Sequence, residues 1–282
     1  MRQDQILQLL NLIRPVQLPI EYTRVGGKGD GGYIIPEDYF KKVDNVISAG
    51  VGGDDSFDLD CANKNLKVFQ FDPSITESPT KNPNITFYPI PFGSYQENFE
   101  NNAGFETIKN NTSLKTYLKK YSLKDGYYVF NLDHILWLTK LQDKQILFKC
   151  DVEGSEWVGF ALSSELAYRK ISILVVEFHG FFGNADESGY KLGMQALLKI
   201  SKFLYPVIVQ VNNAFGSDRS FNVFSGIPIP TTFEITFVNK NYIDGIKDPK
   251  YQIGTHHKLA DSNNVNEDLI LWNPNWFFFD KY

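Results

Sequence analysis

The feature that most constrains the fold is the stretch at residues 45–58, where a short apolar run, a glycine turn and an acidic segment follow one another. In α/β proteins this order predicts a buried strand, a tight turn and a helix whose first N–H groups face a ligand. A second apolar run at 67–71 ends at Asp72, which follows Gly52 by 20 residues. A carboxylate at about that spacing binds the ribose hydroxyls in α/β nucleotide sites. We therefore predict a nucleotide-type site on Gly50, Gly52 and Asp72.

The residues around this turn discriminate between cofactors. The dinucleotide fingerprint G-x-G-x-x-G requires a third glycine where this chain has Asp55. Asp54, Asp55 and Asp58 would also repel a pyrophosphate. S-adenosylmethionine has no phosphate and carries a sulfonium and an ammonium, so acidic neighbours suit it. The pattern favours S-adenosylmethionine over NAD, which stays the alternative.

A second informative stretch, ILFKCDVEGSEW at 146–157, is an apolar strand pattern followed by three acids. Ligands of open α/β sheets bind outside the carboxyl ends of the strands. Asp151 and Glu153 are therefore candidate site residues, because carboxylates beside a buried strand are costly to desolvate unless they bind something. Glu156 is explained equally well as a charge that complements a helix N-terminus.

Two further segments add candidates. The strand pattern at 171–176 leads into Glu177 and His179, and their position favours a site histidine over a core histidine. The glycine-dense segment at 24–35 matches the dinucleotide fingerprint only weakly, because no strong strand precedes it. It is either a flexible hairpin or a flap over the cofactor, with Asp30 or Tyr33 at the amino-acid end.

The rest of the chain completes an α/β pattern. Apolar periodicity predicts helices over 1–14, 131–141 and 189–203, and strands over 84–90, 206–211 and 232–238. The last strand alternates polar and apolar residues, which suits antiparallel pairing at a sheet edge. Asp133 is the predicted N-cap of its helix, and His134 is predicted to lie on the surface. The adjacent His256 and His257 do not suggest a metal pair.

Composition narrows the class of protein. The net charge is −5, with 28 basic and 33 acidic residues and no long basic run, which argues against a nucleic-acid partner. Cys61 and Cys150 are too few for a disulfide framework or a zinc site. No apolar run reaches membrane-spanning length and no signal-peptide pattern opens the chain, so we expect a soluble, cytoplasmic protein.

Seven segments together resemble the FkbM-type group of S-adenosylmethionine-dependent O-methyltransferases. The DVEGSEW string at 151–157 is the most specific of them, and EFHG at 177–180 supports it; the others are 24–33, 46–58, 68–74, 212–213 and 233–237. The turn at 51–53 departs from the glycine–alanine–asparagine sequence typical of that group. The segment 209–211 lacks the histidines often found before the paired asparagines.

The resemblance implies a class I methyltransferase fold: a doubly wound α/β domain with a seven-stranded, mostly parallel sheet whose last strand is antiparallel. We expect one domain over 1–282, with an N-terminal segment 1–44, an insertion 94–132 and a C-terminal extension 240–282. The group often methylates sugar hydroxyls of polysaccharides, glycolipids or natural products. A small-molecule or glycan acceptor, and a homodimer, are the expected partners.

Methylation of a hydroxyl requires a base or a metal ion. We favour His179 as the base, paired with Glu177 or Asp151, without an obligatory metal. Mg²⁺ held by Asp151 and a neighbouring carboxylate stays open, as do a NAD-dependent nucleotide-sugar oxidoreductase and a non-catalytic binding module. The expected cofactor contacts are Asp30, Gly31, Tyr33, Gly50, Gly52, Asp54, Ser56, Asp72, Pro73, Ser74, Asp151 and Glu153.

Overall fold

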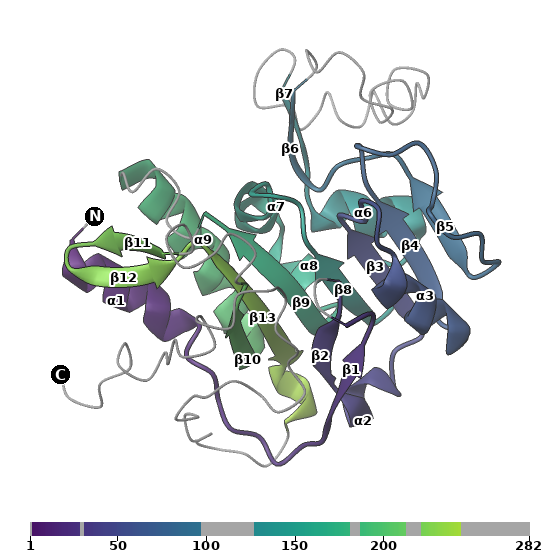
Figure 1. The fold of residues 1–282 in the computed structure, drawn as a ribbon, viewed down its shortest axis with the longest axis horizontal. Helices are drawn as coiled ribbons and strands as arrows, with labels where there is room; N and C mark the ends of the chain where they lie inside the picture. Colours follow the sequence, from purple (N-terminus) through teal and green to yellow (C-terminus); the bar gives the residue numbers. More distant parts are fainter. Residues whose placement is uncertain (1, 29–30, 97–126, 181–186, 213–220, 244–282) are drawn as a thin grey trace.

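The computed structural model describes residues 2–28, 31–96, 127–180, 187–212 and 221–243 (Figure 1). A seven-stranded sheet forms its centre, with the strand order β10-β13-β9-β8-β3-β4-β5. The strands of this sheet are β3 (Asn45–Ala49), β4 (Lys67–Phe71), β5 (Ile85–Tyr88), β8 (Ile146–Cys150), β9 (Ile171–His179), β10 (Leu204–Val211) and β13 (Thr232–Asn239).

Neighbouring strands from β9 to β5 pair in parallel, whereas β13 pairs antiparallel with both β9 and β10. This confirms the predicted fold class, a doubly wound α/β sheet of seven mostly parallel strands whose last strand is antiparallel. The predicted edge position of the last strand is wrong, since β13 lies between β9 and β10 and is buried throughout. Its alternating polar residues face other parts of the chain: Thr236 Oγ1, for example, donates to Ile34 O at 2.7 Å.

Helices cover both faces of the sheet (Figure 1). They are α1 (Gln3–Leu12), α2 (Glu37–Phe40), α3 (Ser56–Asn63), α6 (Leu132–Thr139), α7 (Glu156–Leu162), α8 (Glu165–Tyr168) and α9 (Glu187–Phe203), with a 3-10 turn, η1 (Lys240–Tyr242). Three small antiparallel pairs accompany the sheet: β1 (Tyr22–Val25) with β2 (Tyr33–Pro36), β6 (Gly93–Gln96) with β7 (Tyr127–Phe130), and β11 (Phe221–Phe224) with β12 (Ile227–Pro230).

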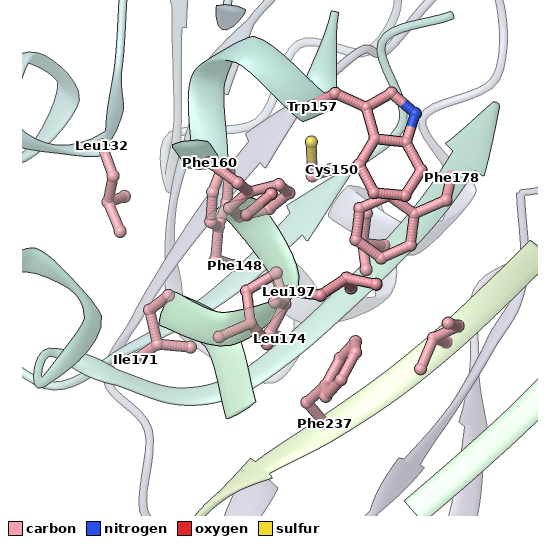
Figure 2. Packing of buried hydrophobic residues seen from close by; sticks show 14 of the residues in the cluster. Leu132, Phe148, Cys150, Trp157, Phe160, Ile171, Leu174, Phe178, Leu197 and Phe237 are labelled. Atoms are coloured by element: carbon pink, nitrogen blue, oxygen red, sulfur yellow. The ribbon is translucent and has the colours of Figure 1, made fainter. Parts of the chain in front are cut away.

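Consecutive strand residues supply two separate hydrophobic clusters, as expected for a sheet that is covered on both faces. In β3, Val46 belongs to the cluster with α2, α3 and the β1–β2 pair, whereas Ile47 belongs to the cluster with α1, α6, α7, α8 and α9. Figure 2 shows aromatic packing in the second cluster, where Trp157 stacks on Phe178 with ring centroids 4.3 Å apart. Burying such a side chain contributes about 1.5–3 kcal/mol.

Three local predictions need correction. The ends of the predicted irregular insertion form the β6–β7 pair, which projects from the sheet in Figure 1. The N-cap of α6 is Asn131, whose side chain accepts from His134 N at 3.2 Å. Asp133 instead accepts from Ser164 N at 2.7 Å, at the N-cap of α8, two helices further along the chain. His134 is buried, not exposed, and its Nδ1 accepts from Asn131 N at 3.1 Å.

Other predictions fall outside the described residues. They concern Asp30, the centre of the insertion and the C-terminal segment with His256 and His257. Within the ranges that the structure describes, none of the helices combines the length and the apolar character needed to cross a bilayer. Both cysteines, Cys61 and Cys150, are buried free thiols.

Candidate functional site

The glycine turn joins three strand ends. Gly50 has a φ of +80°, and a Cβ added there would lie 1.4 Å from Asp151 O, so only glycine fits. Gly50 N donates to Phe71 O at 2.9 Å, and Lys149 Nζ donates to Gly50 O. The ends of β3, β4 and β8 therefore meet at one edge of the sheet, which we call the carboxyl edge, together with the adjacent end of β9.

Asp72 fastens the glycine turn to the end of β4. Its Oδ2 accepts from Val51 N and Gly52 N, both at 2.8 Å, and its Oδ1 accepts from Ser74 N at 2.7 Å and Ser74 Oγ at 2.6 Å. Burial would raise the pKa of Asp72, but these donors outweigh burial and lower it. Two donors occupy each oxygen, so the carboxylate is fully hydrogen-bonded within the chain. Pro73 lies half-buried in the same turn.

The residues that follow the glycine turn bind the loop of the β1–β2 pair, which we call the N-terminal hairpin. Ser56 Oγ accepts from Gly27 N at 2.9 Å and lies 3.5 Å from Gly31 O, while Asp54 Oδ1 accepts from Ser56 N at 2.9 Å. A Cβ at Gly31 would come within 2.8 Å of Asp54 Oδ2. Gly31, Asp54 and Ser56, three of the residues predicted to bind the cofactor, thus lie together where the β1–β2 loop packs against the start of α3.

Two of the acids that argued against a pyrophosphate point away from the turn. Asp55 accepts from Thr80 N at 3.0 Å and from Thr80 Oγ1 at 2.9 Å. Asp58 is buried and accepts from Gln70 Nε2 at 2.7 Å, and burial raises its pKa despite the opposing charge of Lys149. The charge argument against NAD therefore rests on Asp54 alone.

The end of β8 carries Asp151 and Glu153. Tyr33 Oη donates to Asp151 Oδ2 at 3.2 Å, which connects the N-terminal hairpin to the carboxyl edge. Lys149 Nζ lies 3.8 Å from the same oxygen. Glu153 has a φ of +55° and its side chain is 85% exposed. Lys149 was missed as a site residue, and its one signal was a cation inside an otherwise apolar strand, next to Asp151.

Four carboxylates surround His179 at the end of β9. Its Nε2 lies 3.4 Å from Glu177 Oε1, 3.5 Å from Glu153 Oε2 and 3.8 Å from Asp151 Oδ1, and its Nδ1 lies 3.5 Å from Glu156 Oε1. Burial disfavours the charged imidazolium, but Glu156 and Glu177 outweigh burial and raise the pKa of His179 to about 11. Four carboxylates around one imidazole favour its charged form, and the role of His179 as the base stays a prediction.

Buried groups hold this cluster in place. Glu156 is completely buried, and it accepts from Gly154 N at 2.8 Å and from His179 N at 2.6 Å. Trp157 Nε1 donates to His179 O at 2.8 Å, and Asn212 Nδ2 donates to Glu177 Oε1 at 2.7 Å. Glu156 therefore bridges the ends of β8 and β9, a role that its sequence position did not indicate.

Among the described residues, the side chains of Asp151, Glu177 and His179 form a group that could hold a metal ion, with one ligand atom of each lying within 4.8 Å of the others. The carboxyl edge thus combines a glycine turn that is fixed by Asp72 with a charged cluster on the neighbouring strands. The predicted residues Asp72 and Asp151 lie on the same edge, because the turn between them contacts both.

No protein-family model and no curated protein matches the sequence. Similar solved structures include a Listeria monocytogenes protein assigned as an S-adenosylmethionine dependent methyltransferase, at 12% identity and a TM-score of 0.34, covering 72% of this chain and 97% of that one. A Clostridium thermocellum protein assigned as an rRNA methylase matches at 15% identity and a TM-score of 0.28, and the match covers 72% of this chain and 92% of that one. Spermidine synthase from Thermotoga maritima matches at 13% identity and a TM-score of 0.30, and the match covers 89% of this chain and 84% of that one. At these values we base no functional conclusion on them.

Proposed function

We propose that the protein is an S-adenosylmethionine-dependent O-methyltransferase of the FkbM type. The observation that carries this proposal is the pairing, on one carboxyl edge, of a glycine turn fixed by Asp72 with the acids that follow β8. A Cβ added at Gly52 or Gly53 would meet no atom of the described chain within 4 Å, so the turn has room for a ligand against its backbone. A phosphate-free, cationic cofactor suits this acidic surrounding better than a dinucleotide does.

In this proposal the ribose lies against Asp72. The hydroxyl of Ser74, an exposed residue, occupies one position on Asp72 Oδ1 at 2.6 Å. A ribose hydroxyl can take that position while the exposed serine turns to water, so no buried donor loses its acceptor. The three backbone donors keep the carboxylate in place throughout. The sulfonium and the ammonium would then face Asp151 and Glu153.

The reaction is a direct displacement. The acceptor oxygen forms a bond to the methyl carbon, the carbon–sulfur bond breaks, and its electron pair stays on sulfur as a neutral thioether. Alignment of the two reactants supplies much of the catalysis, about 7–11 kcal/mol in favourable cases. The acceptor proton would pass to Glu153, whose exposed carboxylate reaches the cluster. The sugar acceptor, a homodimer and a cytoplasmic location stay predictions from the sequence.

A thermal-shift comparison tests the cofactor. At a ligand concentration of 100 Kd, S-adenosylhomocysteine should stabilise the protein by about 2.7 kcal/mol, and NAD should not. The matched control is Thr80→Val, which changes a contact of the neighbouring Asp55 outside the proposed cofactor surface and should keep the shift. Stabilisation by NAD alone would replace the methyltransferase proposal with the oxidoreductase. If neither ligand stabilised the protein, the alternative of a non-catalytic binding module would be favoured.

A further inference from the structure

The charged cluster at the ends of β8 and β9 has the composition of a metal site. We propose that Asp151, Glu177 and His179 bind a divalent first-row transition ion, such as Mn²⁺ or Co²⁺. The Nε2 of His179 lies 3.4 Å from Glu177 Oε1 and 3.8 Å from Asp151 Oδ1, and all three ligand atoms lie within 4.8 Å of one another. Ligands at about 2.1 Å from an ion are roughly 3.0–3.5 Å apart, so small side-chain movements complete the site.

The groups behind the ligands have the arrangement of an outer ligand shell. Metal-binding histidines usually donate their second ring N–H to a carboxylate, which fixes the tautomer that points its lone pair at the ion. Here the buried Nδ1 of His179 has no hydrogen-bond partner among the described residues, yet it lies 3.5 Å from Glu156 Oε1. Asn212 in turn orients Glu177 through a 2.7 Å hydrogen bond.

The surrounding charge favours a cation. Glu153 Oε2 lies 3.5 Å from the same Nε2, and the strand register places the buried Glu234 of β13 directly opposite Glu177. Carboxylates that gather in a poorly solvated region repel one another unless positive charge lies between them. Lys149 Nζ, at 3.8 Å from Asp151 Oδ2, supplies one positive charge. When His179 binds as the neutral imidazole, a divalent ion would supply the positive charge that the imidazolium otherwise places among these carboxylates.

The ligand types select the class of ion. Imidazole nitrogen suits first-row transition ions, whereas Mg²⁺ prefers oxygen ligands alone. The site therefore differs from the oxygen-only Mg²⁺ site considered from the sequence. Its role, but not its existence, rests on the proposed function. The ion would bind the acceptor oxygen and stabilise the negative charge that appears as its proton passes to water through Glu153; that oxygen would then attack the methyl carbon as the carbon–sulfur bond breaks.

The direct test is a Mn²⁺ titration followed by the electron paramagnetic resonance signal of free Mn²⁺. The full chain is used without a histidine tag, stripped with a chelator and free of any adenosyl ligand. We expect saturable binding of one ion per chain, which Co²⁺ displaces and millimolar Mg²⁺ does not. Glu177→Gln and His179→Gln should each weaken binding by at least about 10-fold, the loss that even outer-shell changes cause.

Two controls make the result decisive. Glu165→Gln removes an exposed carboxylate that pairs with Lys202 outside the site, and it should leave Mn²⁺ binding unchanged. The double variant His256→Gln/His257→Gln should do the same. Absence of saturable binding in the folded wild-type chain would overturn the proposal, as would binding that persists in both Glu177→Gln and His179→Gln. Binding of S-adenosylhomocysteine in the presence of the chelator is a separate measurement, so the two proposals fail independently.

Discussion

The two halves of the carboxyl edge differ in how their acids are held. At the β3–β4 half, four donors contact Asp72 at 2.6–2.8 Å, and all of them come from its own chain. At the β8–β9 half, the carboxylates approach the His179 ring only to 3.4–3.8 Å. The first half is therefore preorganised by the backbone, whereas the second has charged atoms at distances that a ligand between them could shorten. This difference suggests a division of labour between cofactor and acceptor.

The largest expected effect tests the contact that joins the two halves. Gly50→Ala places a Cβ 1.4 Å from Asp151 O in a residue with positive φ, so backbone must move. We expect a loss of more than about 4 kcal/mol in the free energy of unfolding, or failure to fold. Gly53→Ala is the matched control, because its Cβ would meet no described atom within 4 Å. Equal urea midpoints for both variants would show that the halves are not in contact.

The second prediction concerns the support of the β8–β9 half. Glu156→Ala removes the acceptor of both Gly154 N and His179 N inside a fully buried site. We expect a loss of about 3–5 kcal/mol, measured by urea unfolding. Glu156→Gln keeps one acceptor oxygen, so its free energy of unfolding should fall clearly less than that of Glu156→Ala. If glutamine and alanine were equally destabilising, the negative charge rather than the two hydrogen bonds would hold this half.

Much of the fold was readable from the sequence because uniformly apolar runs such as 46–49 and 171–176 have few alternatives to a buried parallel strand. The internal position of β13 could not be read, because alternation at 232–238 is compatible both with an edge strand and with a buried strand whose polar side chains bond to neighbouring segments. The same limit explains the misplaced N-cap of α6. Asn131 and Asp133 are both good capping residues, and only the docking of α8 decides between them.

The site was predictable in its location but not in its internal bonding. Asp72, Asp151 and His179 follow strand patterns directly, so the topology places them on one edge. Their partners come from distant segments: Tyr33 lies 118 residues before Asp151, and Asn212 lies 35 residues after Glu177. A single sequence contains no signal for such pairs. For the same reason the four-carboxylate surrounding of His179 could not be anticipated.

The third prediction measures the preorganisation of the β3–β4 half. Asp72→Asn replaces one acceptor oxygen by a donor and should cost about 2–3 kcal/mol at neutral pH. The folded-state pKa of Asp72 is lowered, so its charge stabilises the fold above the ordinary carboxyl pKa and this contribution disappears as pH falls through the folded value. The stability difference between the wild type and Asp72→Asn should therefore shrink below about pH 4. A difference that stays constant down to pH 2 would contradict this account.

The smallest expected effect tests the link from the hairpin to the β8–β9 half. Tyr33→Phe removes a 3.2 Å hydrogen bond to Asp151 and should cost about 1 kcal/mol in a thermal melt. Tyr39→Phe is the matched control, because its hydroxyl donates to Tyr242 O at 2.9 Å away from the carboxyl edge. Only Tyr33→Phe should also weaken S-adenosylhomocysteine binding. Equal ligand affinity in both variants would place the hairpin outside the cofactor site.

The central claim is that the two halves serve different ligands, and a crossed titration tests it most directly. S-adenosylhomocysteine and Mn²⁺ are each titrated calorimetrically into wild type, Asp72→Asn and Glu177→Gln. We expect Asp72→Asn to lose affinity for the adenosyl ligand and keep Mn²⁺, and Glu177→Gln to show the reverse. If both variants lost both ligands equally, or if wild type bound neither, the division of the carboxyl edge into a cofactor half and a metal half would be wrong.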